Sequence, residues 1–176
     1  MQKIAIFGKP ANGKSTLSKQ LAYSTGIKLH AIDSIFYQSD GEEIPRKRFE
    51  AIHESIITKK SWIIEGFGPL NSLDSFYARL KAADTLVYID LPYFTTYWLV
   101  TKRLIKGLFV KPDGWPEGSS IIKGTIKTYK ILKACPQFWN DDFEEQLRNF
   151  KGKRTIYHIR SISELNSFIS NAKKPF

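Results

Sequence analysis

Nine residues near the start of the chain, Gly8 to Thr16, have the residue types and spacing of a phosphate-binding loop. The segment GKPANGKST matches the pattern G-x-x-x-x-G-K-[ST] at every fixed position. Glycines let the backbone wrap closely around a phosphate, and the helix that follows adds the positive end of its dipole. We expect the Lys14 ammonium to reach the β- and γ-phosphates of ATP and the Ser15 hydroxyl to ligate Mg²⁺. The predicted nucleotide-binding residues are Gly8, Lys9, Pro10, Ala11, Asn12, Gly13, Lys14, Ser15 and Thr16.

Three acidic residues stand at the ends of predicted strands: Asp33, Glu65 and Asp90. Because ligands bind at the carboxyl ends of the strands in an open parallel sheet, all three are expected near Ser15. Asp33 is predicted to orient an acceptor hydroxyl or hold a magnesium-bound water, and its alternative role is to cap a turn. Glu65 is predicted to bind Mg²⁺ through water, and its alternative role is a salt bridge. Asp90 fits either a second metal-site acid or a structural turn before Pro92.

Two arginines, Arg46 and Arg48, lie at the start of the second predicted helix and are candidates for binding an acceptor phosphate. A guanidinium group binds phosphate oxygens in a bidentate fork, although a solvated helix start fits these residues equally well. Arg79, on a later predicted helix, is interpreted as a surface charge.

A strongly basic segment runs from Tyr93 to Cys135, with eight Lys or Arg residues against two acids. A cationic flap closing over a triphosphate would neutralise charge and exclude water, and Arg103 is the candidate for that role. Three lysines at helical spacing, Lys123, Lys127 and Lys130, suggest a basic face, which could instead contact nucleic acid.

Apolar runs alternate with helical patterns along the chain, which predicts an α/β fold with a parallel sheet flanked by helices. The predicted strands cover residues 3–8, 28–32, 62–65, 85–91 and 154–159. The predicted helices cover residues 14–25, 45–60, 73–83, 93–106, 119–133, 136–150 and 163–170, the last capped by Ser163. We expect one domain over residues 1–176, with a mobile basic lid at about 103–135.

The composition sets limits on class and compartment. The chain has 176 residues, of which 42% are hydrophobic, so a folded globule is expected. A net charge of +10 favours anionic partners without choosing among them. The single cysteine, Cys135, excludes an internal disulfide, fits a cytoplasmic protein and is interpreted as a buried hydrophobe. The three histidines, His30, His53 and His158, have no metal-ligand companion at a useful spacing and are interpreted as structural.

The most apolar stretch, residues 85–100, is interrupted by Asp90 and Pro92. It is too short and too broken to span a bilayer, and we expect no membrane partner.

Five segments in order, GKPANGKSTL, LHAIDSIFY, WIIEGF, ADTLVYIDLP and the basic helix and loop, resemble the adenylate-kinase-like P-loop kinases. Within that group the chain is most similar to bacterial DNA topology modulation proteins of the FlaR type. The resemblance implies a three-layer α/β/α P-loop nucleoside triphosphate hydrolase fold. It also implies a five-stranded parallel sheet of order 2-3-1-4-5 with a lid-like helical insert after the fourth strand. It places Glu65 near magnesium and Arg103 at the base of the lid.

One departure from the kinase pattern concerns the acceptor. Kinases of nucleoside monophosphates usually continue the third strand with an arginine, whereas Phe67 is followed here by Gly68, Pro69 and Leu70. Asp33 follows the second predicted strand, which is similar to the position of an acid in related small-molecule kinases. This resemblance implies an acceptor that carries a hydroxyl group.

The sequence therefore predicts a kinase that transfers the γ-phosphoryl group of Mg-ATP to a small acceptor. Lys14, Asp33 and Arg103 are the predicted catalytic residues, Ser15 and Glu65 the metal site, and Asp33, Arg46 and Arg48 the acceptor site. The alternative is an ATP-binding protein that associates with nucleic acid through its basic helix.

Overall fold

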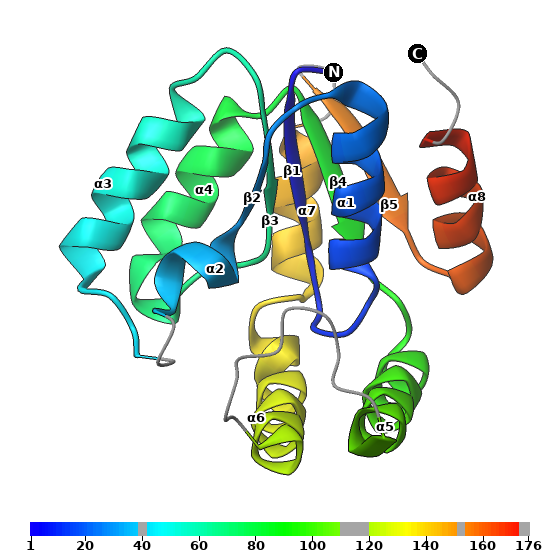
Figure 1. The fold of residues 1–176 in the computed structure, drawn as a ribbon. Coiled ribbons are helices and arrows are strands. Elements are labelled where there is room, and N and C mark those ends of the chain that lie inside the picture. Colours follow the sequence, from blue (N-terminus) through cyan, green and yellow to red (C-terminus); the bar gives the residue numbers. More distant parts are fainter. Residues whose placement is uncertain (39–41, 110–119, 151–153, 173–176) are drawn as a thin grey trace.

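Five parallel strands form the single sheet of the computed structural model, which describes residues 1–38, 42–109, 120–150 and 154–172. The strand order is β2-β3-β1-β4-β5, which confirms the predicted topology (Figure 1). Ile6 pairs with Glu65 on one side of β1, and Gly8 pairs with Ile89 on the other. The strands are β1 (Lys3–Gly8), β2 (Leu29–Ala31), β3 (Trp62–Glu65), β4 (Thr85–Ile89) and β5 (Thr155–Ile159).

Helices cover both faces of the sheet because side chains along each strand alternate between its two sides. Ala5 and Phe7 of β1 belong to the core beneath α3 (Arg46–Ile57), α4 (Leu73–Ala82) and α7 (Asp141–Asn149). Ile4 and Ile6 belong to the core beneath α1 (Lys14–Thr25) and α8 (Ile162–Ala172). The central strands are therefore buried from both sides, as their near-continuous apolar sequences predict.

Two further helices, α5 (Tyr93–Phe109) and α6 (Ile121–Ala134), lie beyond the carboxyl ends of the strands (Figure 1). Val100 and Leu132 pack with Cys135 in a small core of their own, so Cys135 is a buried hydrophobe as predicted. The predicted lid spans the second half of α5 and all of α6, while residues 110–119 lie outside the described part of the chain.

Several local predictions were wrong. Asp33 lies in a short helix, α2 (Ile32–Phe36), rather than at a strand end. The helix predicted over 136–150 is divided into a 3₁₀ turn, η2 (Cys135–Gln137), and α7, because Asn140 caps α7 by accepting a bond of 3.0 Å from Phe143 N–H. The cap of α8 is Ser161 rather than Ser163, since its hydroxyl accepts from Glu164 N–H at 3.1 Å. A second 3₁₀ turn, η1 (Leu70–Ser72), precedes α4.

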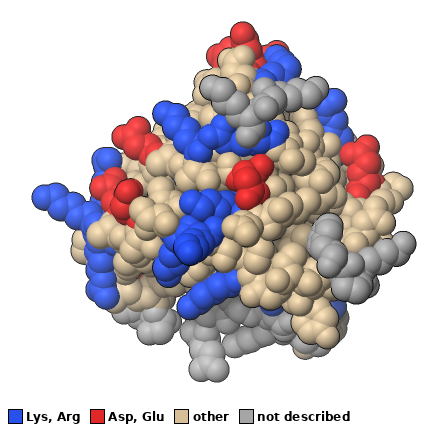
Figure 2. Space-filling view, turned by 90° about the horizontal axis from the view of Figure 1, so that it is seen from above, with Lys and Arg blue, Asp and Glu red and all other residues tan. Residues whose placement is uncertain are grey.

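Positive charge is not restricted to the α5–α6 side. Figure 2 shows the opposite end of the molecule, at the amino ends of the strands, where Lys and Arg side chains are interspersed with Asp and Glu. Asp84 belongs to that end and accepts backbone bonds of 2.8 and 2.9 Å from Gln2 and Lys3.

Candidate functional site

The predicted phosphate-binding loop, between β1 and α1, contains three residues with positive φ angles. Gly8 and Gly13 adopt positive φ angles of 133° and 78°, and Ala11 adopts 59°. A Cβ atom on Gly8 would lie 2.1 Å from the carbonyl oxygen of Ile89, so the close approach of β4 requires glycine at this position. The loop then leads directly into α1, whose first helical residue is Lys14.

The side chain of Lys9 anchors the loop to the segment that follows β4. It is 3% exposed, pairs with the carboxylate of Asp90 and donates to the carbonyl of Leu91 at 3.0 Å. Its ammonium also lies 4.6 Å from the centre of the Tyr93 ring. Of the two roles open to Asp90, the structure therefore favours the structural one.

Asn12, the last of the four variable positions of the loop, also anchors it to neighbouring elements. Its side chain is fully buried, donates to the carbonyl of Ile89 at 3.4 Å and accepts from the Thr96 hydroxyl at 2.8 Å. The side chains of Lys9 and Asn12 are thus committed to β4 and α5, and only their backbone groups are left for a phosphate.

Three side chains converge where the loop enters α1. The Lys14 ammonium donates to the carbonyl of Lys9 at 2.6 Å, and the Ser15 hydroxyl donates to Glu65 Oε2 at 3.4 Å. Burial lowers the pKa of Lys14, and the negative charges of Glu65 and Asp33 oppose that shift. Burial raises the pKa of Glu65, against the effect of the nearby Lys14 charge. Ser15 and Glu65, the two predicted metal ligands, thus lie within hydrogen-bond distance of each other, and the Lys14 charge is close to Glu65.

The charges of Asp33 and Arg103, two of the predicted catalytic residues, act on this cluster. The charge of Asp33 raises the pKa values of both Lys14 and Glu65, and the charge of Arg103 lowers that of Lys14. Asp33 is exposed on α2, and Arg103 is exposed on α5. Both charges therefore lie within electrostatic range of the loop lysine.

The proposed acceptor arginines lie at the start of α3. Both are exposed, and Arg46 Nε donates to Glu50 Oε1 at 2.7 Å, so its charge already has a partner. On α6, the Lys127 ammonium donates to the Tyr37 hydroxyl at 3.3 Å and lies 5.0 Å from the centre of its ring. This contact joins α6 to the residue that follows α2.

Arg79 is buried, which corrects its interpretation as a surface charge. It is 1% exposed, and its Nη2 donates to the carbonyls of Gly66 and Phe67 at 2.9 and 3.0 Å. Burial lowers its pKa to about 9. The arginine fixes the turn that follows Glu65 and so helps to place that carboxylate. The spacing of Phe76, Arg79, Leu80 and Ala83 along one apolar helix face is the signal that could have revealed its burial.

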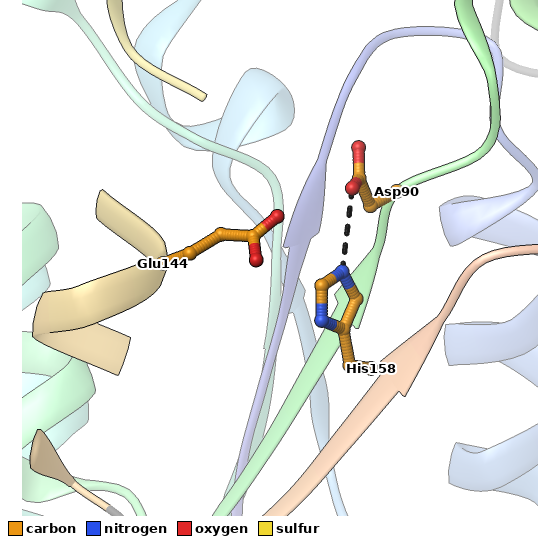
Figure 3. A group of neighbouring side chains, drawn as sticks. All are labelled: Asp90, Glu144 and His158. Atoms are coloured by element: carbon orange, nitrogen blue, oxygen red, sulfur yellow. Dashed lines mark hydrogen bonds and ion pairs between the residues drawn. The ribbon is translucent and has the colours of Figure 1, made fainter. Parts of the chain in front are cut away.

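His158 has acidic neighbours that its isolated position in the sequence did not predict. Figure 3 shows it beside Asp90 and Glu144, and His158 Nε2 lies 3.3 Å from Asp90 Oδ2. Although burial acts to raise it, hydrogen bonds from His158 and Lys9 bring the pKa of Asp90 down to about 2. The ligand types suit a cation, but Lys9 pairs with Asp90, and Arg160 lies 3.3 Å from Glu144. The negative charges of Asp90 and Glu144 are thus paired with Lys9 and Arg160, and we interpret the cluster as structural.

Comparison with solved structures finds this fold in shikimate kinase from Bacteroides thetaiotaomicron. The match has a TM-score of 0.53 and 11% sequence identity, and it covers 96% of this chain and 94% of that chain. At this identity the likeness concerns the fold alone. No family model matches the chain, and no curated protein matches it. No helix among the described residues is long and apolar enough to cross a membrane.

Proposed function

We propose that this chain is a P-loop kinase that transfers the γ-phosphoryl group of Mg-ATP to a small acceptor bearing a hydroxyl group. The observation that carries the proposal is the convergence at the end of the loop, where Ser15 lies 3.4 Å from Glu65 and Lys14 is surrounded by the charges of Glu65 and Asp33. A loop that only bound phosphate would not need two acids, one at the end of β3 and one on α2, beside its lysine.

The oxygen ligands at this site fit magnesium. A hydroxyl and a carboxylate are hard oxygen donors, and Mg²⁺ commonly keeps water between itself and such carboxylates. Ser15 and Glu65 would hold the ion together with the nucleotide phosphates, and the ion would neutralise phosphate charge during transfer.

The chain's own residues would supply positioning and electrostatic stabilisation. Backbone N–H groups of the loop and the Lys14 ammonium would hold the β- and γ-phosphates, while Asp33 would accept a hydrogen bond from the acceptor hydroxyl. Arg103, on the helix beyond the strand ends, would stabilise charge on the transferring group. Closure of α5 and α6 over the site as a lid would exclude water.

A panel of acceptors tests the proposal. The chain is incubated with Mg-ATP and, one at a time, with nucleoside monophosphates, nucleosides, hydroxy acids and small alcohols, and ADP release is measured. One acceptor class is expected to raise ADP release well above the rate without acceptor. If no acceptor raises it and ATP still binds, the chain is a nucleotide-binding module without turnover, and the kinase proposal fails.

The alternative that the sequence leaves open is an ATP-binding protein that associates with nucleic acid through its basic helix. Contacts between lysines and a phosphate backbone would produce a steep loss of DNA affinity with increasing salt. We favour the kinase because Lys127, at the centre of the basic face, is directed to Tyr37 beside the proposed acceptor site.

A further inference from the structure

The outer face of α5 carries large apolar side chains in solvent. Phe94 is 86% exposed, Phe109 is 83% exposed, and Trp98, Ile105 and Leu108 are each more than half exposed. Apolar surface of this extent on one helix is costly for a protein in water and commonly marks a contact site. The proposed kinase activity makes no use of it.

These side chains lie on one side of the helix. At 100° per residue, Phe94, Trp98, Ile105 and Phe109 fall within about 60° of the helix circumference, with Leu108 at one border. The opposite side of α5 is buried at Thr96, Val100 and Gly107. The stripe, defined here as Phe94, Trp98, Ile105, Leu108 and Phe109, therefore points away from the body of the molecule.

Positive charge borders the stripe. Lys102 and Lys106 are exposed and follow it along its other border at helical spacing. The described residues of α5 and α6 include no Asp or Glu. An occupant of this face would therefore meet an apolar stripe with a cationic margin and no negative charge.

We propose that α5 docks in the plane of an anionic lipid surface. Helices with Trp, Phe and Leu on one face and lysines beside them bury the apolar face at the boundary between headgroups and acyl chains. The indole of Trp98 suits that boundary, and Lys102 and Lys106 would contact acidic headgroups. The contact is made on the surface and needs no spanning helix. This proposal differs from the prediction of no membrane partner made from the sequence.

Two other occupants fit less well. A second copy packed through the same stripe would place the lysines of two α5 helices close together, and like charges in contact are destabilising. A nucleic acid would attract the lysines but would leave the aliphatic and aromatic stripe in water. An anionic lipid surface would bury the apolar side chains of the stripe and also pair with Lys102 and Lys106.

Vesicle flotation with the full chain tests this proposal and does not require ATP or turnover. The two probes are vesicles of pure phosphatidylcholine and vesicles in which one quarter of the lipid is phosphatidylglycerol. We expect tighter binding to the acidic vesicles, weakening with salt. The double variant Lys102→Gln/Lys106→Gln should lose about tenfold in affinity or more, since each lysine near an acidic surface contributes about fivefold.

The apolar part is tested by the double variant Phe94→Ser/Trp98→Ser, which should bind acidic vesicles at least about 30-fold more weakly. Tyr23→Ser is the matched control, because Tyr23 is an exposed aromatic (88%) on α1, away from the stripe. It should bind as the unmodified chain does. Thermal unfolding confirms that each variant folds, which is expected because the altered side chains are exposed.

Three results would overturn the proposal. The first is that the unmodified chain floats no better than Phe94→Ser/Trp98→Ser. The second is a dimer in sedimentation that this variant converts to a monomer, without vesicle binding. The third is binding of duplex DNA that depends on Lys102 and Lys106, again without vesicle binding. None of these results bears on ADP release, so the kinase proposal would stand or fall separately.

Discussion

The ammonium of Lys9 pairs with the carboxylate of Asp90 and so ties the second residue of the predicted phosphate loop to the residue that follows β4. Both groups are shielded, with Lys9 almost completely buried, and His158 holds the other oxygen of Asp90. The phosphate-loop pattern leaves the position of Lys9 unspecified. In this chain it supplies the anchor that keeps the loop against the sheet.

This ion pair predicts strong coupling in a double-mutant cycle. Lys9→Met and Asp90→Asn should each lower the free energy of unfolding by about 2–4 kcal/mol, because each leaves a shielded charge without its partner. The double variant should lose at least about 1 kcal/mol less than the sum of the single losses. Urea unfolding measures all three, and strictly additive losses would show that the two side chains do not depend on each other.

The packing of Gly8 against β4 gives a second prediction. Gly8→Ala should lower the free energy of unfolding by about 3 kcal/mol or more, because its Cβ would lie 2.1 Å from the Ile89 carbonyl oxygen. Gly26→Ala is the matched control, since Gly26 also has a positive φ, of 69°, but has open space around a Cβ. It should cost only about 1 kcal/mol. Similar losses for both variants would mean that backbone strain, not the contact with β4, sets the requirement at Gly8.

Replacement of Lys14 should greatly weaken nucleotide binding. Lys14→Ala is expected to weaken ATP binding about 100-fold or more, because a cation bonded to phosphate oxygens is lost. Isothermal titration with ATP measures the change. Lys19→Ala, which removes an exposed lysine from the same helix, should bind ATP normally. ATP affinity in Lys14→Ala equal to that of Lys19→Ala would refute the site.

Substitutions of the two acids near Lys14 should affect different quantities: Glu65 the Mg²⁺ requirement and Asp33 the rate of turnover. Glu65→Gln should raise the Mg²⁺ concentration needed for half-maximal ADP release by about 10–100-fold, as expected for a carboxylate that holds the ion through water. Asp33→Asn should leave the Mg²⁺ requirement unchanged and lower kcat by about 100-fold or more, because its proposed contact is with the acceptor hydroxyl. A shift in the Mg²⁺ requirement of Asp33→Asn as large as that of Glu65→Gln would assign Asp33 to the metal instead.

The sequence was sufficient to predict the sheet because its signals are local. Buried parallel strands read as apolar runs, and Gly26 ends α1 in the left-handed conformation expected of a helix-terminal glycine. The proximity of Ser15 and Glu65 was also expected, since the residues that follow β1 and the acid that ends β3 lie at the same edge of a parallel sheet.

Side-chain partners drawn from distant segments could not be predicted in this way. Lys9 and Asp90 are 81 residues apart, and the chain between them gives no local sign of the pair. His158 was interpreted from its own surroundings in sequence, whereas its neighbours come from the end of β4 and from α7. Arg79 was predicted at the surface because charged side chains are usually exposed, whereas its position on an apolar helix face buries it.

A buried histidine predicts that the fold weakens as pH falls. His53 on α3 is 2% exposed, and burial, with a smaller effect from the charge of Arg79, lowers its pKa to about 4. In the unfolded chain its pKa would be about 6.5. The unfolded state therefore binds more protons between these values, so this contribution to stability is complete above pH 6.5 and declines towards pH 4.

His53→Leu removes this titration while keeping an apolar side chain beside Phe49, whose ring His53 stacks against at 5.8 Å. Between pH 7 and pH 4.5, the unmodified chain should lose about 2–3 kcal/mol more of its free energy of unfolding than the variant. Urea unfolding at the two pH values measures both losses. The low pKa of Asp90 acts mainly below pH 4, and the raised pKa of Glu65 contributes equally to both proteins. Equal losses in the two proteins would show that His53 is not held neutral by the fold.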